Sequence, residues 1–84
     1  VTVLQNVVCV PTNGKPELRY YYKLDVNTGA VSQADVSALK PNQLNSWCTM
    51  DDTRAVLQLV DVRYIYMDRT GTNIGQIQLS VNEC

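Results

Sequence analysis

Alternation of apolar and polar side chains is clearest between residues 18 and 26, where it predicts a half-buried β-strand. One side of this strand carries Leu18, Tyr20, Tyr22, Leu24 and Val26. The other side carries Arg19, Tyr21, Lys23 and Asp25. We expect the first set to face the interior and the second set to remain in water.

Three further segments have strand character. Residues 1–10, "VTVLQNVVCV", are rich in β-branched side chains and stop at the turn-forming "PTNGKP". Residues 55–67, "AVLQLVDVRYIYM", predict one long strand that bends near Val60 and Asp61. Residues 74–81 alternate again after "DRTGTN", which predicts a hairpin loop.

The middle of the chain is less clear. Gly29 in "NTGA" suits a tight hairpin that needs a positive φ. In residues 31–40, Ser32 and Asp35 resemble the N-terminal cap of a helix, whereas Val31 and Val36 favour a strand, and we interpret the first half as strand. Residues 40–46, "KPNQLNS", have the composition of a loop, after which Trp47 and Cys48 are expected to close over the core.

Short strands separated by regular turn signals predict an all-β fold, with room for one short helix. The expected architecture is a small antiparallel barrel or sandwich of six to seven strands. With 84 residues, the chain is long enough for a single domain, residues 1–84, whose stability margin is thin enough for a partner to matter. No apolar run approaches the roughly 20 residues of a membrane helix.

Charge and composition argue against several classes of binding and catalytic site. A net charge of −1 argues against unspecific capture of a polyanion by the whole surface. The chain has no histidine, which excludes histidine-dependent triads and histidine-rich metal sites. Asp51 and Asp52 are neighbours that face opposite sides of an extended chain, and "TGTNIG" lacks the lysine and helix of a phosphate loop. We therefore expect no enzyme activity, no cofactor and no metal.

The three cysteines cannot all pair within one chain, and their spacing fits no zinc or redox motif. We interpret Cys9 and Cys48 as small buried hydrophobic residues of a reducing compartment, in preference to a disulfide. Cys84 is left as a free thiol or an intermolecular crosslink.

Basic and aromatic residues together form the most informative set. Cations that meet phosphates and rings that stack on bases are the side chains that grip single-stranded nucleic acid. The candidate RNA-binding residues are Arg19, Tyr21, Lys23, Arg63, Tyr64 and Tyr66. The alternative is that the tyrosines are core residues with hydroxyls at the rim and that the cations only aid solubility.

Several short motifs resemble the coronavirus replicase subunit non-structural protein 9. These are "VRYIYM", "TNIGQIQL", "NVVCV" and "CTMDDT". The chain is shorter than members of that family and has no clear C-terminal helix with small residues at a dimer seam. The resemblance implies a divergent nidovirus relative that forms a small RNA-binding β-barrel. It would act as a non-enzymatic accessory protein of viral RNA replication in the host cytoplasm, binding single-stranded RNA weakly, contacting replicase proteins and forming a homodimer.

A second hypothesis is a protein–protein interaction module, a β-sandwich of virion or adhesion type, in which exposed strands or the tyrosine-rich face meet another protein. Such a protein would be secreted or part of a virion. An intact disulfide would favour this hypothesis over a cytoplasmic RNA-binding protein.

Overall fold

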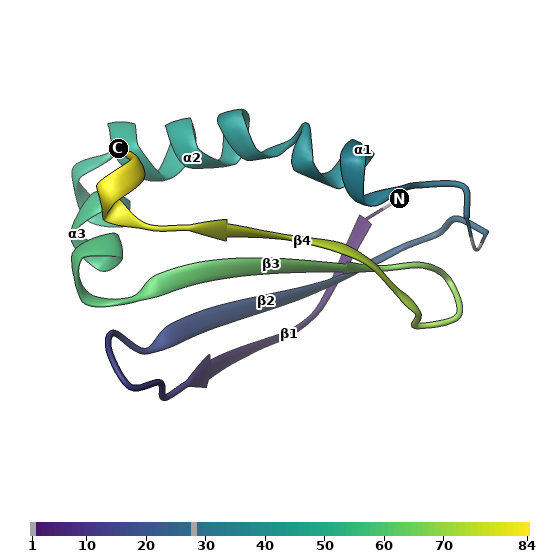
Figure 1. Cartoon of the computed structure of the whole chain (residues 1–84), viewed down its shortest axis with the longest axis horizontal. Helices are drawn as coiled ribbons and strands as arrows, with labels where there is room; N and C mark the ends of the chain where they lie inside the picture. The colour runs from purple at the N-terminus through teal and green to yellow at the C-terminus, as the bar shows by residue number, and fades with distance from the viewer. Residues whose placement is uncertain (1, 28) are drawn as a thin grey trace.

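The computed structural model describes residues 2–27 and 29–84 and forms one mixed β-sheet with helices on one of its faces (Figure 1). Val1, the first residue of the strand predicted at residues 1–10, lies outside the described residues. Thr28 of the "NTGA" turn also lies outside them. The elements are β1 (Thr2–Val10), β2 (Glu17–Leu24), α1 (Gln33–Ser37), α2 (Lys40–Thr49), α3 (Asp51–Leu59), β3 (Asp61–Met67), β4 (Asn73–Leu79) and the 3₁₀ turn η1 (Val81–Glu83).

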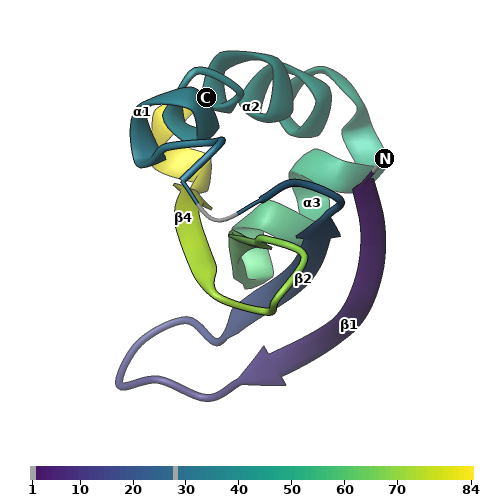
Figure 2. The ribbon, with the colours of Figure 1, turned by 90° about the vertical axis from the view of Figure 1, so that its right-hand side faces the viewer.

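The strands lie in the order β1-β2-β3-β4. β1 and β2 are antiparallel, β2 and β3 are parallel, and β3 and β4 are antiparallel. A parallel pair needs a crossover connection, and here the three α-helices between β2 and β3 supply it. Figure 2 shows α1 and α2 above the sheet, with β1 curving along its edge.

The prediction of an all-β fold is wrong. The described residues form four strands, not six to seven, and the sheet has two edges instead of closing into a barrel or facing a second sheet. The error lies between residues 31 and 60, where helices stand in place of predicted strand and loop. Short apolar runs fit both a buried helix and a strand, so periodicity alone could not separate them.

α1 corrects the interpretation of residues 31–40 as partly strand. Ser32 is the N-cap, and its hydroxyl accepts from the backbone N–H of Asp35 while the Asp35 carboxylate accepts from the backbone N–H of Ser32. This reciprocal capping satisfies N–H groups that a helix start leaves without partners. Val36 then points into the core, with 1% of its surface exposed. Gly29 does have a positive φ of 84°, but it leads into α1 and not into a hairpin.

α2 and α3 correct the predicted loop at residues 40–46 and the predicted bent strand at residues 55–67. Pro41 lies in the first turn of α2, where a missing N–H is tolerated because no intrahelical partner exists for it. Asp51 and Asp52 begin α3, where carboxylates interact favourably with the helix dipole. α3 ends at Leu59, and only residues 61–67 of the predicted long strand are extended.

The core lies between the sheet and the helices. Its fully buried members include Leu57 of α3, Val62 of β3 and Leu79 of β4, each with no exposed surface. Four tyrosines, Tyr20, Tyr22, Tyr64 and Tyr66, stack in a row across β2 and β3, with neighbouring ring centroids 5.2 to 5.8 Å apart. Trp47 closes this row from α2, as expected, because its indole N–H donates to the Tyr64 hydroxyl at 2.7 Å.

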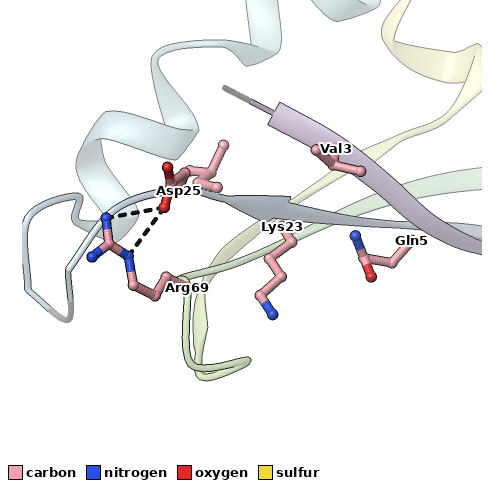
Figure 3. Close-up of a pocket in the computed structure, with 6 residues that line it drawn as sticks. Val3, Gln5, Lys23, Asp25 and Arg69 are labelled. Carbon is pink, nitrogen blue, oxygen red and sulfur yellow. Dashed lines mark hydrogen bonds and ion pairs between the residues drawn. The ribbon is translucent and has the colours of Figure 1, made fainter.

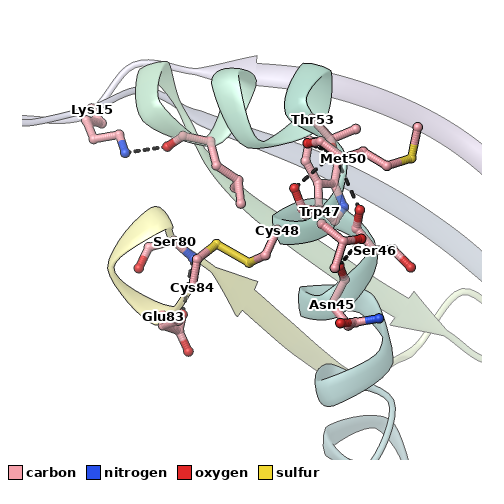
Figure 4. The surroundings of a disulfide bond; sticks show 12 residues. Lys15, Asn45, Ser46, Trp47, Cys48, Met50, Thr53, Ser80, Glu83 and Cys84 are labelled. Carbon is pink, nitrogen blue, oxygen red and sulfur yellow. Dashed lines mark hydrogen bonds between the residues drawn. A yellow bond between two sulfur atoms is a disulfide. The ribbon is translucent and has the colours of Figure 1, made fainter.

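A disulfide between Cys48 and Cys84 joins α2 to the C-terminal turn (Figure 4). This corrects two expectations at once, because Cys48 is not a free buried thiol and Cys84 is neither free nor an intermolecular crosslink. Cys9 is the free cysteine, and it is exposed on β1 instead of buried. The sequence did not reveal the pair, because Cys48 was expected to be a buried thiol at the core and nothing in the chain indicated that Cys84, 36 residues later, returns to it.

The loop between β3 and β4 is a hairpin connection, as the sequence predicts. Asp68 is buried and accepts at Oδ1 from the backbone N–H groups of Thr70 and Thr72. Gly71 takes a φ of 89°, a conformation that glycine adopts without strain. This hairpin fixes the register of β4 on β3.

Candidate functional site: the open face of the sheet

The helices cover one face of the sheet and leave the opposite face free of helices, and we call this second face the open face (Figure 1). The pairing register places Arg19 beside Arg63 and Tyr21 beside Ile65 across β2 and β3. Gln76 of β4 follows Ile65 in the same row. On the other side of β2, Asn6, Val8 and Val3 of β1 pair with Tyr21, Arg19 and Lys23. The open face therefore carries side chains from all four strands.

An ionic network occupies one end of the open face. The carboxylate of Glu17 accepts from Nε of Arg19 at 2.6 Å and from Nε of Arg63 at 2.8 Å. A second Arg63 nitrogen donates to the other Glu17 oxygen at 3.0 Å, and a third donates to the amide oxygen of Gln76 at 2.9 Å. Because Glu17 has only 5% of its surface exposed, its charge depends on these two arginines for stabilisation.

The pKa of Glu17 reflects two opposed effects. Burial by itself raises the pKa of the carboxyl, but the hydrogen bonds and charges of Arg63 and Arg19 outweigh it and hold the pKa below the ordinary value of 4.5. The ionised form is thus favoured in the folded protein. The network sets the orientation of both guanidinium groups on the open face.

We expect the stability of the protein to fall as the pH is lowered below 4.5. A carboxyl whose pKa is lower in the folded than in the unfolded chain stabilises the fold above its unfolded pKa, and this contribution disappears as the pH falls through the folded pKa. Glu17→Gln should remove this part of the acid dependence and lower the free energy of unfolding at neutral pH by about 1–3 kcal/mol. Urea unfolding between pH 3 and pH 7 measures both effects.

The matched control is Asp25→Asn. Asp25 pairs with Arg69 at 3.0 Å, but both side chains are more than half exposed, so solvent screens the pair. Its removal should leave the acid dependence almost unchanged. If Asp25→Asn and Glu17→Gln have equal effects, the Glu17 network is not a stabilising element.

Lys23 lies at the other end of the open face. It borders a hollow of about 380 Å³ whose lining also includes Val3, Gln5 and the Asp25–Arg69 pair (Figure 3). Within residues 2–27 and 29–84, Lys23 has no carboxylate within ion-pair distance, and Figure 3 shows its amine directed away from Asp25. Its charge is consequently free to meet a ligand.

Tyr21 and Ile65 form the apolar centre of the open face. Ile65 has 7% of its surface exposed although no helix covers it, because neighbouring side chains on the same face shield it. Tyr21 is half-buried and stands between the Arg19 and Lys23 positions of its own strand. A flat ring flanked by cations can stack on an aromatic or planar group and hold a neighbouring negative charge.

Of the six candidate residues, four lie together on the open face and two do not. Arg19, Tyr21 and Lys23 of β2 and Arg63 of β3 share this face. Tyr64 and Tyr66 point to the opposite face and belong to the core, with 6% and 5% of their surfaces exposed. Adjacent residues of a strand face opposite sides, so Arg63 could not share a surface with Tyr64.

Sequence reasoning did not group Glu17, Ile65 and Gln76 with the candidate residues of this face. Strand alternation held the signal for Glu17, because residues 17, 19, 21 and 23 have the same parity. Ile65 has the parity of Arg63 in the same way. Gln76 could be found only after the register of β3 and β4 was known.

The burial of the tyrosine row has an electrostatic consequence. Burial raises the pKa values of Tyr22, Tyr64 and Tyr66 above the ordinary value of 10.0, because the ionised phenolate is poorly solvated between sheet and helices. The hydrogen bond from Trp47 opposes this rise at Tyr64 without cancelling it. These three rings therefore act as neutral core residues at ordinary pH.

A metal-binding cluster and a membrane-spanning helix are both absent from the described residues. No group of three or more cysteine, aspartate or glutamate side chains is arranged to hold a metal ion there. In the same part of the chain, no helix combines the length and the apolar character needed to cross a membrane.

Comparison of the chain with protein-family models, with curated proteins and with solved structures finds no match. The comparisons therefore do not bear on the resemblance to the coronavirus replicase subunit.

Proposed function

We propose that the chain is a non-enzymatic binding module that holds single-stranded RNA weakly on the open face of its sheet. The observation that carries this proposal is the grouping of Arg19, Lys23 and Arg63 around Tyr21 on a face that no helix covers. A four-stranded sheet with helices behind it and an aromatic ring in front is one of the common platforms for single-stranded RNA.

The charges of the open face support binding that is weak and sensitive to salt. Arg19 and Arg63 share the carboxylate of Glu17, whereas Lys23 has no such partner among the described residues. With the Asp25–Arg69 pair beside Lys23 included, the face has four cations, Arg19, Lys23, Arg63 and Arg69, against the two carboxylates of Glu17 and Asp25. The face is therefore positive on a chain of net charge −1. One ring, Tyr21, is available for stacking, which contributes about 1–3 kcal/mol per base.

The proposal is tested by fluorescence anisotropy with a labelled single-stranded RNA oligomer at low and moderate salt. We expect saturable binding with a dissociation constant of roughly tens of micromolar at low salt that weakens as salt is added. Absence of salt-sensitive binding in this range would contradict the proposal.

Three variants connect the binding to the open face. Lys23→Gln should weaken binding severalfold and reduce its salt dependence, because one phosphate contact is lost. Tyr21→Ala should weaken binding by about tenfold, the effect of one lost stacking contact. Arg54→Gln removes the same charge from an exposed position of α3, on the helix side, and should leave binding unchanged. If Arg54→Gln weakens binding as much as Lys23→Gln does, net charge and not the open face is responsible.

A role as an accessory protein of viral replication, with replicase proteins as partners and the host cytoplasm as location, rests on the sequence resemblance alone. Its first test is the RNA titration, because a chain that does not bind RNA has no remaining argument for this role. Pull-down from an extract would address the replicase partners only after that test.

A second candidate function is a protein-interaction module of an oxidising compartment, and the Cys48–Cys84 disulfide favours it. Tyrosine and arginine are enriched at protein interfaces, so the same open face suits a protein partner. The mass of the unreduced protein, isolated with free thiols blocked, separates the candidates. A mass that is lower by two hydrogens, with a single blocked thiol, would show one disulfide and support an oxidising compartment. A mass with three blocked thiols would show that no disulfide had formed and would count against this candidate.

A further inference from the structure

The two edge strands of the sheet, β1 and β4, differ in their contacts with the rest of the protein. At the β4 edge, the side-chain amide of Gln33 on α1 accepts from the backbone N–H of Gln76 at 3.0 Å and donates to its carbonyl at 3.2 Å. Gln33 thus makes the pair of hydrogen bonds that a neighbouring strand would make. A Cβ added at Gly75 would lie 2.5 Å from the Gln33 side-chain oxygen, so glycine permits this close approach. α1 therefore covers the β4 edge at Gln76.

Within residues 2–27 and 29–84, no side chain covers the β1 edge in this way. Every residue from Thr2 to Cys9 is exposed, and Val10 is only partly buried. The strand has nine residues without a charge or a proline, which are two of the devices that protect an edge strand from pairing. A bulge between Leu4 and Asn6 interrupts its pairing with β2, and the Asn6 side chain accepts from the Val7 N–H at 2.9 Å.

Apolar side chains of β1 are exposed on both faces of the sheet. Val3 and Val8 share the open face with Lys23 and Arg19, and their exposed fractions are 49% and 37%. Leu4 and Val7 lie on the helix side, beside Tyr22 and Tyr20, with 48% and 42% exposed. A strand placed next to β1 would therefore bury apolar surface on both of its sides.

We propose that β1 pairs antiparallel with β1 of a second copy of this chain, so that two four-stranded sheets join into one. A second copy fits because an uncharged strand meets no like charge when it pairs with itself, whatever the register. Antiparallel pairing of one strand with its own copy creates a twofold axis, the commonest symmetry of soluble oligomers. The axis stands perpendicular to the sheet, so the two open faces lie on the same side.

The dimer is independent of RNA binding but would extend the proposed RNA surface. Each copy contributes its own Arg19, Tyr21 and Lys23, and a single strand of nucleic acid could run across both. A strand pair alone is a small interface, so we expect a reversible dimer and not a permanent one.

The test is sedimentation velocity of the Cys9→Ser protein over a range of concentrations, which keeps the Cys48–Cys84 disulfide and prevents crosslinking through Cys9. The mass is expected to rise from the 9.4 kDa of the monomer to twice that value as concentration increases. In this background, Val8→Lys adds a charge to the exposed edge and should weaken the dimer by at least about tenfold. Met50→Lys adds the same charge at an exposed apolar residue between α2 and α3 and should have no effect.

Circular dichroism confirms that both lysine variants are folded. A monomer at all concentrations up to about 1 mM would overturn the proposal. A dimer that Met50→Lys weakens and Val8→Lys does not would also overturn it, because the contact would then involve the helix layer. Neither result decides the RNA proposal, because Arg19, Tyr21, Lys23 and Arg63 all lie on the open face of a single copy.

Discussion

Tyr64→Ala is expected to lower the free energy of unfolding by about 3–5 kcal/mol, the usual range for removing a large aromatic ring from a core. Tyr64 lies in the middle of the tyrosine row, with ring centroids 5.2 Å from Tyr20 and 5.8 Å from Tyr22. Its hydroxyl also accepts from Trp47 at 2.7 Å, so the substitution leaves the indole N–H without its partner. Urea unfolding followed by circular dichroism measures the change.

Tyr21→Ala is the matched control for this prediction. Both residues are strand tyrosines, but Tyr21 stands half-buried on the open face, so its loss should change stability by no more than about 1 kcal/mol. Tyr64→Phe should fall between the two, with a loss of about 1–2 kcal/mol for the hydrogen bond from Trp47. A Tyr21 variant that is as unstable as the Tyr64 variant would mean that the two faces have been assigned the wrong way round.

Replacing both Cys48 and Cys84 with serine is expected to lower the free energy of unfolding by about 3–4 kcal/mol. The bridge spans 36 residues, and a crosslink of this length restricts the unfolded chain by about that amount in the loop-entropy model. The effect is large for a domain of this size, whose total stability is about 5–10 kcal/mol. Thermal and urea unfolding of the two proteins under non-reducing conditions provide the measurement.

Cys9→Ser serves as the reference for the double substitution. Cys9 is exposed and unpaired, so its stability effect should stay within about 0.5 kcal/mol. The double variant should also lose the response to reducing agent that the parent protein shows. Equal stability of the parent protein with and without reductant would contradict a stabilising role for the bridge.

Strand alternation explains what could be predicted from sequence. The pattern in β2 correctly separated Leu18, Tyr20, Tyr22 and Leu24 from Arg19, Tyr21 and Lys23, because a half-buried strand displays its period of two directly. The hairpin between β3 and β4 was also predictable, since Gly71 and the polar loop residues have specific roles in a turn. These features depend on local sequence alone.

The helical layer could not be predicted in the same way. In α3, the apolar residues Val56, Leu57 and Leu59 span too few positions to show helical periodicity, and the segment also suits a strand. The cap formed by Ser32 and Asp35 was visible in the sequence, but the neighbouring valines were given more weight than the cap. The parallel pairing of β2 and β3 depends on this layer, so missing the helices also led to the wrong topology.

The residues of the candidate site also differ in whether local sequence was enough to group them. Members of β2 were found because one strand suffices to group them, whereas Arg63 was grouped with Tyr64 and Tyr66 by closeness in sequence. Alternation within β3 puts them on opposite faces, and the register of β3 on β2 then sets Arg63 beside Arg19 and Tyr64 beside Tyr20. Glu17 has the parity of Arg19 in β2, so its face was readable from the sequence, but its role in orienting both arginines became recognisable only through its contacts.

The central claim is that the open face of the sheet, and not another surface, receives single-stranded RNA. It is tested most directly by titrating the ¹⁵N-labelled protein with an RNA oligomer and following the amide and arginine side-chain signals by NMR. We predict progressive shifts of Arg19, Tyr21, Lys23 and Arg63, with little change in α2 and α3. Signals that do not move, or shifts confined to the helices, would contradict the claim.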